Sequence, residues 1–517
     1  MPAATIQKRL RAGQPAPKLG DYERGCKTFS WMQARAELAG FIRRRGVNIA
    51  YEAVDRHVDD GRGGRVALRC ISRDGTRSDI SYSALRDASN RFASGLQSLG
   101  VAAGERICTL LGTGPAQYIV ALGSWKRQAV FCPLHAGAEP SLVRARLAQV
   151  RPTVIVATAA AYRRYLVPML DQLPGLRFVI LTNGDAADGS APNPTRRSIG
   201  VACRMLDFEA LLTCASAHYE LGNTKPETWA MLHFTAGSGK PRAAVHVHEA
   251  MVCHRASAVS ALDLGEDDLF WCMVDPATAP GTSYGIIAPL VVGCRVLVVE
   301  GRLAPERVYR LLTEQRVNVC YTTPRLLEAL AMYRERPLAE FDLGALRFVA
   351  SCGRRLGAEQ VLWGQQALGL PIHDSWCQPE TGAIMLANYA CLPIKPGAVG
   401  RPLPGIEAAV VRQVGASLKL LDVDRPGQLA LRAGWPSMFR GYLDDEPRYR
   451  RRFAEGWYLS GELVRRDADG YFWLLGPETP AGLQRMRPGL APSAARRAGA
   501  GGQSAQCFRR EALTSLP

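Results

Sequence analysis

One short segment of the chain has the composition of a phosphate-binding loop. An apolar stretch that begins at Trp229 runs into Thr-Ala-Gly-Ser-Gly-Lys at residues 235–240, and alternating apolar residues follow. Glycines free backbone N–H groups, and hydroxyls and a lysine add the donors that cradle a polyphosphate. The spacing excludes a Walker loop, because no helix-opening Gly-Lys-Ser/Thr follows. Alone, the segment fits either a solvated hairpin or a nucleotide site formed by Thr235, Gly237, Ser238, Gly239 and Lys240.

Other reactive side chains have plainer interpretations. His246 and His248 alternate on an expected strand and share one face, a pattern that can indicate zinc. No third ligand lies near them in the sequence, which favours a structural role. Cys377 has no nearby base, so we expect its thiol to line a pocket rather than to act as a nucleophile. Arg401 and Arg440 lie in glycine-flanked turns, where a structural role is expected.

Alternating strands and helices must position these residues. Leu85, Phe92 and Leu96 have helical spacing, and Gly100 ends that helix. A β-α-β order predicts a parallel sheet covered by helices on both faces. The expected strands are 106–111, 129–133 and 153–157, the expected helices are 82–99, 115–126 and 141–149, and a similar alternation runs over 229–369.

The pattern changes after residue 394. Short strands with frequent glycine and proline predict a small, twisted β subdomain, with strands at 407–412, 418–423, 428–432 and 471–475. The 41 residues from Pro477 to Pro517 include eight Ala, six Arg, five Gly and five Pro, but no Val, Ile, Tyr, Trp, Lys or Asp. Such a segment buries too little apolar area to offset its chain entropy, so we expect a disordered tail.

Bulk composition excludes several classes of protein. The net charge is +17, from 64 basic and 47 acidic residues, but arginine is spread along the chain without a nucleic-acid motif. No apolar run has the length of a membrane span, and no signal peptide is evident. Fourteen scattered cysteines without a Cys-x-x-Cys pair indicate buried thiols in a reducing cytoplasm.

With its flanks, the loop resembles the Thr-Ser-Gly-Thr-Thr-Gly-Lys-Pro-Lys-Gly loop of adenylate-forming ligases. Asp374-Ser-Trp-Cys-Gln-Pro-Glu-Thr-Gly382 looks like the family segment whose glutamate holds Mg²⁺, and Trp457-Tyr-Leu-Ser-Gly-Glu462 like the segment that ends in a ribose-binding aspartate. Three more segments narrow the resemblance to AMP-forming acetyl-CoA synthetases, at 48–57, 394–405 and 434–442. The resemblance covers residues 31–476.

The family implies an α/β fold, the large N-terminal domain of adenylate-forming enzymes, with two doubly wound βα subdomains and a small β subdomain. The boundaries that follow are an N-terminal extension at 1–30, the α/β body at 31–393, the β subdomain at 394–476 and the tail at 477–517. A carboxylate attacks the α-phosphate of ATP to release pyrophosphate, and coenzyme A then displaces AMP. The implied cofactors are ATP, Mg²⁺ and CoA, and the implied partners are these small molecules and a short carboxylic acid.

The resemblance also assigns roles to single residues. Lys240 and Glu380 are the expected catalytic residues, and Glu380 is the expected Mg²⁺ ligand. The expected ATP site comprises Thr235, Gly237, Ser238, Gly239, Lys240, Gly353, Asp374, Trp376 and Glu462. The expected acyl pocket comprises Ala279, Pro280, Gly281, Cys377, Gln378 and Pro379.

This chain departs from the family at the residues that do chemistry. The phosphate loop is one residue shorter, and a shift of its donors by about 1 Å can cost roughly a hundredfold in rate. Gly353-Arg-Arg replaces the Gly-Glu-Pro that faces adenine, Glu462 replaces the ribose aspartate, and Ala243 replaces a glycine. Pro379 replaces a threonine, which removes a hydroxyl and a backbone N–H.

The acyl pocket departs in one direction, towards smaller side chains. Cys377 stands where the family has the tryptophan that limits the pocket to acetate. Ala-Thr-Ala-Pro-Gly at 277–281 replaces Gly-Trp-Val-Thr-Gly. We therefore expect a pocket wider than acetate needs.

The match to the family stops at Gly476. The family continues with a ribose-binding arginine, a hinge aspartate and a domain that carries a catalytic lysine, whereas Pro477 and an unrelated sequence follow here. We therefore expect a truncated ligase that is impaired, or a non-catalytic remnant that at most binds nucleotide or acyl-adenylate. The tail has the composition of a GC-rich coding region read out of frame, and we hypothesise a frameshift at or just after the codon for Gly476. Translation of the coding DNA in the other two frames tests this hypothesis. If neither frame stays open, the hypothesis is wrong.

Overall fold

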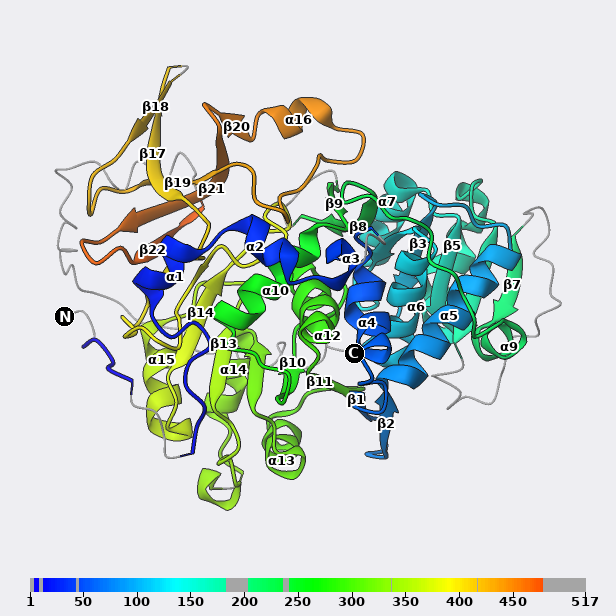
Figure 1. The fold of residues 1–517 in the computed structure, drawn as a ribbon, viewed down its shortest axis with the longest axis horizontal. Coiled ribbons are helices and arrows are strands. Elements are labelled where there is room, and N and C mark those ends of the chain that lie inside the picture. The colour runs from blue at the N-terminus through cyan, green and yellow to red at the C-terminus, as the bar shows by residue number, and fades with distance from the viewer. Residues whose placement is uncertain are drawn as a thin grey trace, which may run out of the picture.

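The computed structural model describes residues 4–8, 13–42, 46–182, 203–235, 241–335, 337–415 and 417–477. Two α/β parts lie side by side, and a smaller antiparallel sheet lies over one of them (Figure 1). The tail that follows residue 477, and most of the predicted phosphate loop (residues 236–240), lie outside the described residues.

A seven-stranded sheet forms the first α/β part. Its strands are parallel except for the edge strand β9, which pairs antiparallel with β8 on either side of the predicted phosphate loop. The strand order is β7-β6-β5-β3-β4-β8-β9, where the strands are β3 (Arg106–Leu110), β4 (Val130–Pro133), β5 (Val154–Thr158), β6 (Phe178–Thr182), β7 (Arg204–Asp207), β8 (Trp229–Phe234) and β9 (Ala243–Val247). Helix α5 (Tyr82–Ser98) precedes β3. The helices between the strands are α6 (Pro115–Lys126), α7 (Pro140–Val150), α8 (Ala159–Ala161), η2 (Tyr162–Leu166), η3 (Val167–Gln172) and α9 (Phe208–Cys214).

A nine-stranded sheet forms the second part. Its order is β16-β15-β14-β13-β12-β10-β11-β1-β2, parallel from β1 to β14 and antiparallel at both edges. The strands are β1 (Val66–Ile71), β2 (Arg77–Ser81), β10 (Leu269–Cys272), β11 (Arg295–Val299), β12 (Val319–Thr322), β13 (Phe348–Ser351), β14 (Ile372–Trp376), β15 (Leu386–Ala387) and β16 (Arg401–Pro402).

The remaining helices lie before and within this second part. Those in the N-terminal region are α1 (Tyr22–Thr28), α2 (Trp31–Ala36), α3 (Ala39–Ile42), η1 (Tyr51–Asp55) and α4 (Arg56–Asp59). Those that follow β9 are α10 (Ala250–Ala261), α11 (Ala279–Thr282), η5 (Ser283–Ile287), α12 (Ala288–Val292), α13 (Pro305–Gln315), α14 (Pro324–Met332), η6 (Leu338–Glu340), α15 (Ala358–Trp363) and η7 (Gly364–Leu368).

A six-stranded antiparallel sheet makes up the small β part. Its order is β18-β17-β19-β21-β20, and β22 also pairs with β21. The elements are β17 (Ala408–Val414), β18 (Ser417–Leu420), β19 (Gly427–Arg432), α16 (Glu446–Arg450), β20 (Phe453–Ala454), β21 (Trp457–Arg466) and β22 (Phe472–Pro477). The preceding strand β16 pairs with β15 and thus belongs to the nine-stranded sheet.

One hydrophobic core joins the two α/β parts. Phe92 of α5 and Trp125 of α6 pack in the same buried cluster as Val291 of α12 and Val298 of β11. Ser81 caps α5 by accepting a hydrogen bond from the Ala84 backbone N–H at 3.1 Å, which explains why the helix begins where its apolar spacing begins. The expected α/β fold with parallel sheets and a small β part is confirmed.

Candidate nucleotide and acyl site

The predicted site residues lie where strands end. Gly353 and two arginines follow β13, and Cys377 follows β14, its neighbour in the parallel part of the sheet. Parallel sheets bind ligands in the crevice outside the carboxyl ends of their strands, because the loops there converge. Glu462 reaches the same place from β21 of the small β part.

A cavity of about 440 Å³ unites residues that are distant in sequence. It includes Gly353 and Trp376 of the predicted ATP site, Glu462 of the predicted ribose contact and Cys377 of the predicted acyl pocket. The full lining is Gly353, Arg354, Arg355, Ser375, Trp376, Cys377, Glu462, Leu474, Leu475 and Gly476. The cavity is therefore lined by residues of both the predicted ATP site and the predicted acyl pocket.

Asp374 does not line this cavity. Its side chain is buried and accepts hydrogen bonds from the backbone N–H groups of Leu356 at 3.4 Å and Ser375 at 3.0 Å. Burial raises the pKa of Asp374 to about 8, so its carboxyl group is largely protonated at neutral pH. The Asp374 side chain therefore holds the loop that carries Leu356 in place behind the cavity wall.

A hydrogen-bond network ties the loop after β14 to β21. The Gln378 amide donates to the Ser460 carbonyl at 3.2 Å and to Glu462 Oε1 at 3.3 Å. The Tyr458 hydroxyl donates to Gln378 Oε1 at 2.8 Å. Burial raises the pKa of Glu462, although the Gln378 hydrogen bond favours the ionised carboxylate. This network sets the distance between Cys377 and Glu462 across the cavity.

Glu380 is buried and already has two donors. The Tyr442 hydroxyl donates to Glu380 Oε1 at 2.6 Å, and Arg452 Nη2 lies 3.3 Å from the same oxygen. Glu380 lies in the loop next to the cavity, but it does not line the cavity. Among the described residues, no group of three or more His, Cys, Asp or Glu side chains is arranged to hold a metal.

Two buried histidines hold the loop on either side of Glu380. His246 Nε2 donates to the Pro379 carbonyl at 2.7 Å, and His254 Nε2 donates to the Gly382 carbonyl at 2.9 Å. Burial lowers the pKa of His246 to about 4 and that of His254 to about 3, so both rings are neutral at pH 7. Gly382 has φ +71° and packs against the His246 ring, where a Cβ would meet the Ser437 carbonyl at 2.3 Å. His246 therefore has a structural role at the site.

The predicted acyl residues divide into two groups. Ala279, Pro280 and Gly281 form most of α11 and do not line the 440 Å³ cavity, whereas Cys377 does. Burial raises the pKa of Cys377 to about 12, so the group is a neutral thiol at pH 7. A neutral thiol is a poor nucleophile, which favours the pocket-lining role. Pro379 contributes its carbonyl to His246 rather than a side chain to the cavity.

The predicted phosphate loop is described only at its ends. The Thr235 N–H donates to the Arg242 carbonyl at 2.9 Å, which closes the base of the β8–β9 hairpin. Ala243, which replaces a family glycine, is fully buried on β9. Gly237, Ser238, Gly239 and Lys240 lie outside the described residues, and their roles stay predictions.

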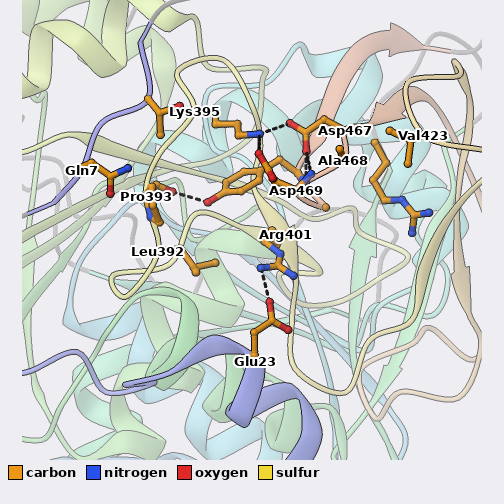
Figure 2. Close-up of a pocket in the computed structure, with 14 residues that line it drawn as sticks. Gln7, Glu23, Leu392, Pro393, Lys395, Arg401, Val423, Asp467, Ala468 and Asp469 are labelled. Atoms are coloured by element: carbon orange, nitrogen blue, oxygen red, sulfur yellow. Dashed lines mark hydrogen bonds and ion pairs between the residues drawn. The ribbon is translucent and has the colours of Figure 1, made fainter.

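A second cavity, of about 800 Å³, lies between the N-terminal segment, the loop before β16 and the turn after β21 (Figure 2). Lys395 pairs there with Asp467 at 2.8 Å and with Asp469 at 2.5 Å, and Arg401 pairs with Glu23 at 2.7 Å. These ion pairs tie the small β part and the first helix to the body. None of the predicted site residues lines this cavity.

Comparison with known proteins identifies the family. Residues 54–443 match the family of AMP-binding enzymes. This chain belongs to that family. It is 33% identical to an acetyl-coenzyme A synthetase of Bacillus subtilis over 473 residues, which cover 91% of this chain and 79% of the relative. It is 29% identical to the acetyl-coenzyme A synthetase of Methanothrix thermoacetophila, with 83% of this chain and 67% of the relative covered.

A solved structure supports the same assignment. The crystal structure of a Brucella canis acyl-CoA synthetase has a TM-score of 0.77 and 28% identity to this AMP-binding enzyme, and the match covers 88% of this chain and 79% of that one. The expected family and fold are therefore confirmed, and the relatives are acetyl-coenzyme A and acyl-CoA synthetases by name. In the described residues of this AMP-binding enzyme, no helix is long and apolar enough to cross a membrane.

Sequence reasoning missed several residues of this AMP-binding enzyme. Tyr442 is the last residue of the 434–442 segment, one of those that carry the resemblance. This motif could therefore have pointed to Tyr442, which contacts Glu380, as a residue of the site. Arg452 had none, because it lies between motifs in an arginine-rich run. His254 and Ser283, which both contact the Gly382 carbonyl, lie on α10 and η5 without any recognisable pattern.

Proposed function

We propose that this chain is an acyl-CoA ligase of the AMP-forming acetate–CoA ligase type, with an impaired adenylation step. The reaction joins a short carboxylic acid to CoA and converts ATP to AMP and pyrophosphate. The observation that carries the proposal is the 440 Å³ cavity, whose lining includes Gly353, Trp376, Cys377 and Glu462. Membership of a family whose named relatives are acetyl-CoA synthetases supports it.

The residues of the chain have separate roles in this proposal. Glu462 faces the cavity and accepts hydrogen bonds from the ribose hydroxyls, while Gln378 and Tyr458 hold it in place. Lys240 and the loop N–H groups bind the phosphates and stabilise charge that develops on their oxygens. Cys377 borders the space for the acyl group.

The described residues do not form a Mg²⁺ site as they stand. Mg²⁺ requires octahedral oxygen ligands at short distances. Glu380 offers one carboxylate, and its Oε1 already contacts Tyr442 and the Arg452 guanidinium. The role of Glu380 as a Mg²⁺ ligand stays a prediction.

Impairment follows from changes around the reacting groups. Pro379 supplies neither the hydroxyl nor the N–H of the family threonine. Arg354 and Arg355 add two exposed cations to the cavity edge, where the family has a glutamate and a proline. Loss of a single preorganised donor in an active site costs about 10²–10³ in rate, so several changes together reduce turnover severely.

The second candidate function is non-catalytic binding of a nucleotide or an acyl-adenylate. The ion pair between Glu380 and Arg452 favours it, because the expected metal ligand is neutralised within the chain. Such a protein keeps the cavity but does not release pyrophosphate from ATP.

Two assays on the full chain test the proposal. ATP–pyrophosphate exchange with acetate, propionate and butyrate reports adenylation, and acetyl-CoA release reports the complete reaction. We expect slow exchange and acetyl-CoA formation far below the ~1 s⁻¹ of an ordinary enzyme. Turnover at or above that rate contradicts the impairment, whereas nucleotide binding without any exchange supports the second candidate.

The preference for chain length is a further prediction of the same site. Acids or acyl-adenylate analogues with three or more carbons are expected to bind better than their acetyl counterparts. Cys377 leaves room that methylenes can fill, each at about 0.8 kcal/mol, or roughly fourfold in affinity. Cys377→Trp is expected to restore the preference for acetate in a calorimetric titration series. Cys377→Ser keeps the volume small and serves as the control, and equal affinities across chain lengths in all three proteins disprove the prediction.

A further inference from the structure

Arg452 has four acceptors next to and including Glu380. Its Nε donates to the Tyr442 hydroxyl oxygen at 3.1 Å, and its Nη1 lies 3.4 Å from the carbonyls of both Leu459 and Ser460. Its Nη2 lies 3.3 Å from Glu380 Oε1. The guanidinium is therefore held in one orientation by the loop after β14, by β21 and by the segment that carries Tyr442.

The Arg452 guanidinium compensates the negative charge of the buried Glu380 carboxylate. The Glu380 side chain is 4% exposed and that of Arg452 is 25% exposed. A buried carboxylate is costly unless it is paired, and the guanidinium supplies both an opposite charge and a donor. Among the ion pairs of the described residues, Arg452 has no carboxylate partner besides Glu380.

A divalent cation at Glu380 would meet this guanidinium. Both are cations that contact the same carboxylate, and like charges this close together repel each other. Arg452 and Tyr442 both contact Oε1 of Glu380, so a metal bound to this carboxylate would lie beside the guanidinium and be repelled by it. ATP carries a triphosphate whose charge is normally balanced by Mg²⁺, whereas a nucleoside monophosphate or an acyl-adenylate carries much less charge.

We propose that Arg452 takes the place of the divalent cation at Glu380, so that this site holds a nucleoside monophosphate or an acyl-adenylate without a metal. The inference deepens the second candidate function, the binding of a nucleotide or an acyl-adenylate, and rests on it, because it names the form of nucleotide that the cavity retains. It concerns a side chain outside the family motifs, one that contacts the expected metal ligand directly. Arg452 is a positioning residue in this proposal, since it acts through Glu380.

The experiment compares the full wild-type chain with Arg452→Gln. AMP binding is titrated by calorimetry in EDTA and in Mg²⁺, and protein-bound Mn²⁺ is measured by electron paramagnetic resonance with and without AMP. For the wild type we expect AMP affinity to change by less than about twofold with metal, and no bound Mn²⁺. For Arg452→Gln we expect bound Mn²⁺ and an AMP affinity that metal increases at least about tenfold, because a charge repulsion has been removed.

Three further variants assign the effect. Arg450→Gln removes an exposed arginine of α16 that pairs with Glu446, and it is expected to behave as the wild type. Arg452→Lys keeps the positive charge, and we expect it to bind AMP independently of metal. This variant tests the inference also in the case that Arg452→Gln does not fold. Adding Glu380→Gln to Arg452→Gln is expected to abolish the Mn²⁺ signal, which places the metal at Glu380.

The outcomes separate the inference from the proposed function. AMP binding by the wild type that needs metal overturns the inference and leaves the proposed function standing. Wild-type Mn²⁺ binding equal to that of Arg452→Gln also overturns it. Absence of nucleotide binding in every variant removes the proposed function, and the Mn²⁺ comparison then still decides whether Arg452 excludes a metal from Glu380.

Discussion

Acidification from pH 7 to pH 5 is expected to destabilise the folded protein through four buried histidines. Burial lowers the pKa of His57, His248 and His254 to about 3 and that of His246 to about 4. In the unfolded chain each ring takes up a proton near pH 6.5. The unfolded state therefore binds more protons between pH 6.5 and 4, so stability falls as the pH falls through this window. The loss is about 2 kcal/mol for each histidine at pH 5, or about 8 kcal/mol for the four.

Asp374 opposes this effect. Burial raises its pKa to about 8, so the folded protein holds a proton that the unfolded chain releases above its ordinary pKa. Its contribution to stability grows as the pH falls from 8 towards 4 and amounts to about 3 kcal/mol between pH 7 and 5. The four histidines together outweigh Asp374, so stability is expected to fall between pH 7 and 5.

Urea unfolding followed by circular dichroism between pH 7.5 and 5 measures the effect. His248→Asn is the informative variant, because asparagine can accept the hydrogen bond that the Ile49 N–H now donates to His248 Nδ1 at 3.1 Å. We expect this variant to lose about 2 kcal/mol less than the wild type between pH 7 and 5. His218→Asn, at an exposed loop position, is the matched control. A wild-type midpoint that does not move between pH 7 and 5 contradicts the prediction.

Replacement of Lys126 by methionine is expected to cost about 3–5 kcal/mol of stability, because it leaves a buried carboxylate without its counter-ion. Lys126 is fully buried and donates to Asp55 Oδ1 at 2.7 Å and to the Asn90 side-chain oxygen at 2.6 Å. Burial raises the pKa of Asp55, with Lys126 acting in the opposite direction. The pair joins α6 to η1 and thus links the two α/β parts.

The double variant Lys126→Met/Asp55→Leu separates the ion pair from packing. Removing both charges together is expected to recover most of the loss, because a buried pair and apolar side chains of similar volume are often equally stable. Arg310→Met breaks the exposed pair with Glu314 on α13 and is expected to cost less than about 1 kcal/mol. A loss below 1 kcal/mol for Lys126→Met in urea unfolding shows that the buried pair does not support the fold.

The amino-acid sequence by itself determined the α/β architecture and the motifs of the cavity. Helical spacing of Leu85, Phe92 and Leu96 and continuous apolar strands such as Val154–Thr158 are local patterns, so they predict elements without knowledge of the fold. Gly353, Trp376, Cys377 and Glu462 were found through the motifs of the resemblance. The parallel strands β13 and β14 bring the first three to one edge of the sheet, whereas Glu462 comes from β21 of the small β part. The boundaries were less exact: the strand expected at 418–423 is Ser417–Leu420.

The tertiary structure alone decided how these residues are charged and paired. Arg452 and Glu380 are 72 residues apart, and Tyr442 and Glu380 are 62 apart. Contacts of this kind depend on how the small β part packs on the body, and no periodicity in the chain records that packing. The neutral state of His246 and His254 and the protonated state of Asp374 likewise follow from burial, which raises the free energy of the charged form. A motif thus located the expected metal ligand, but only the packing of distant segments showed that an arginine already contacts it.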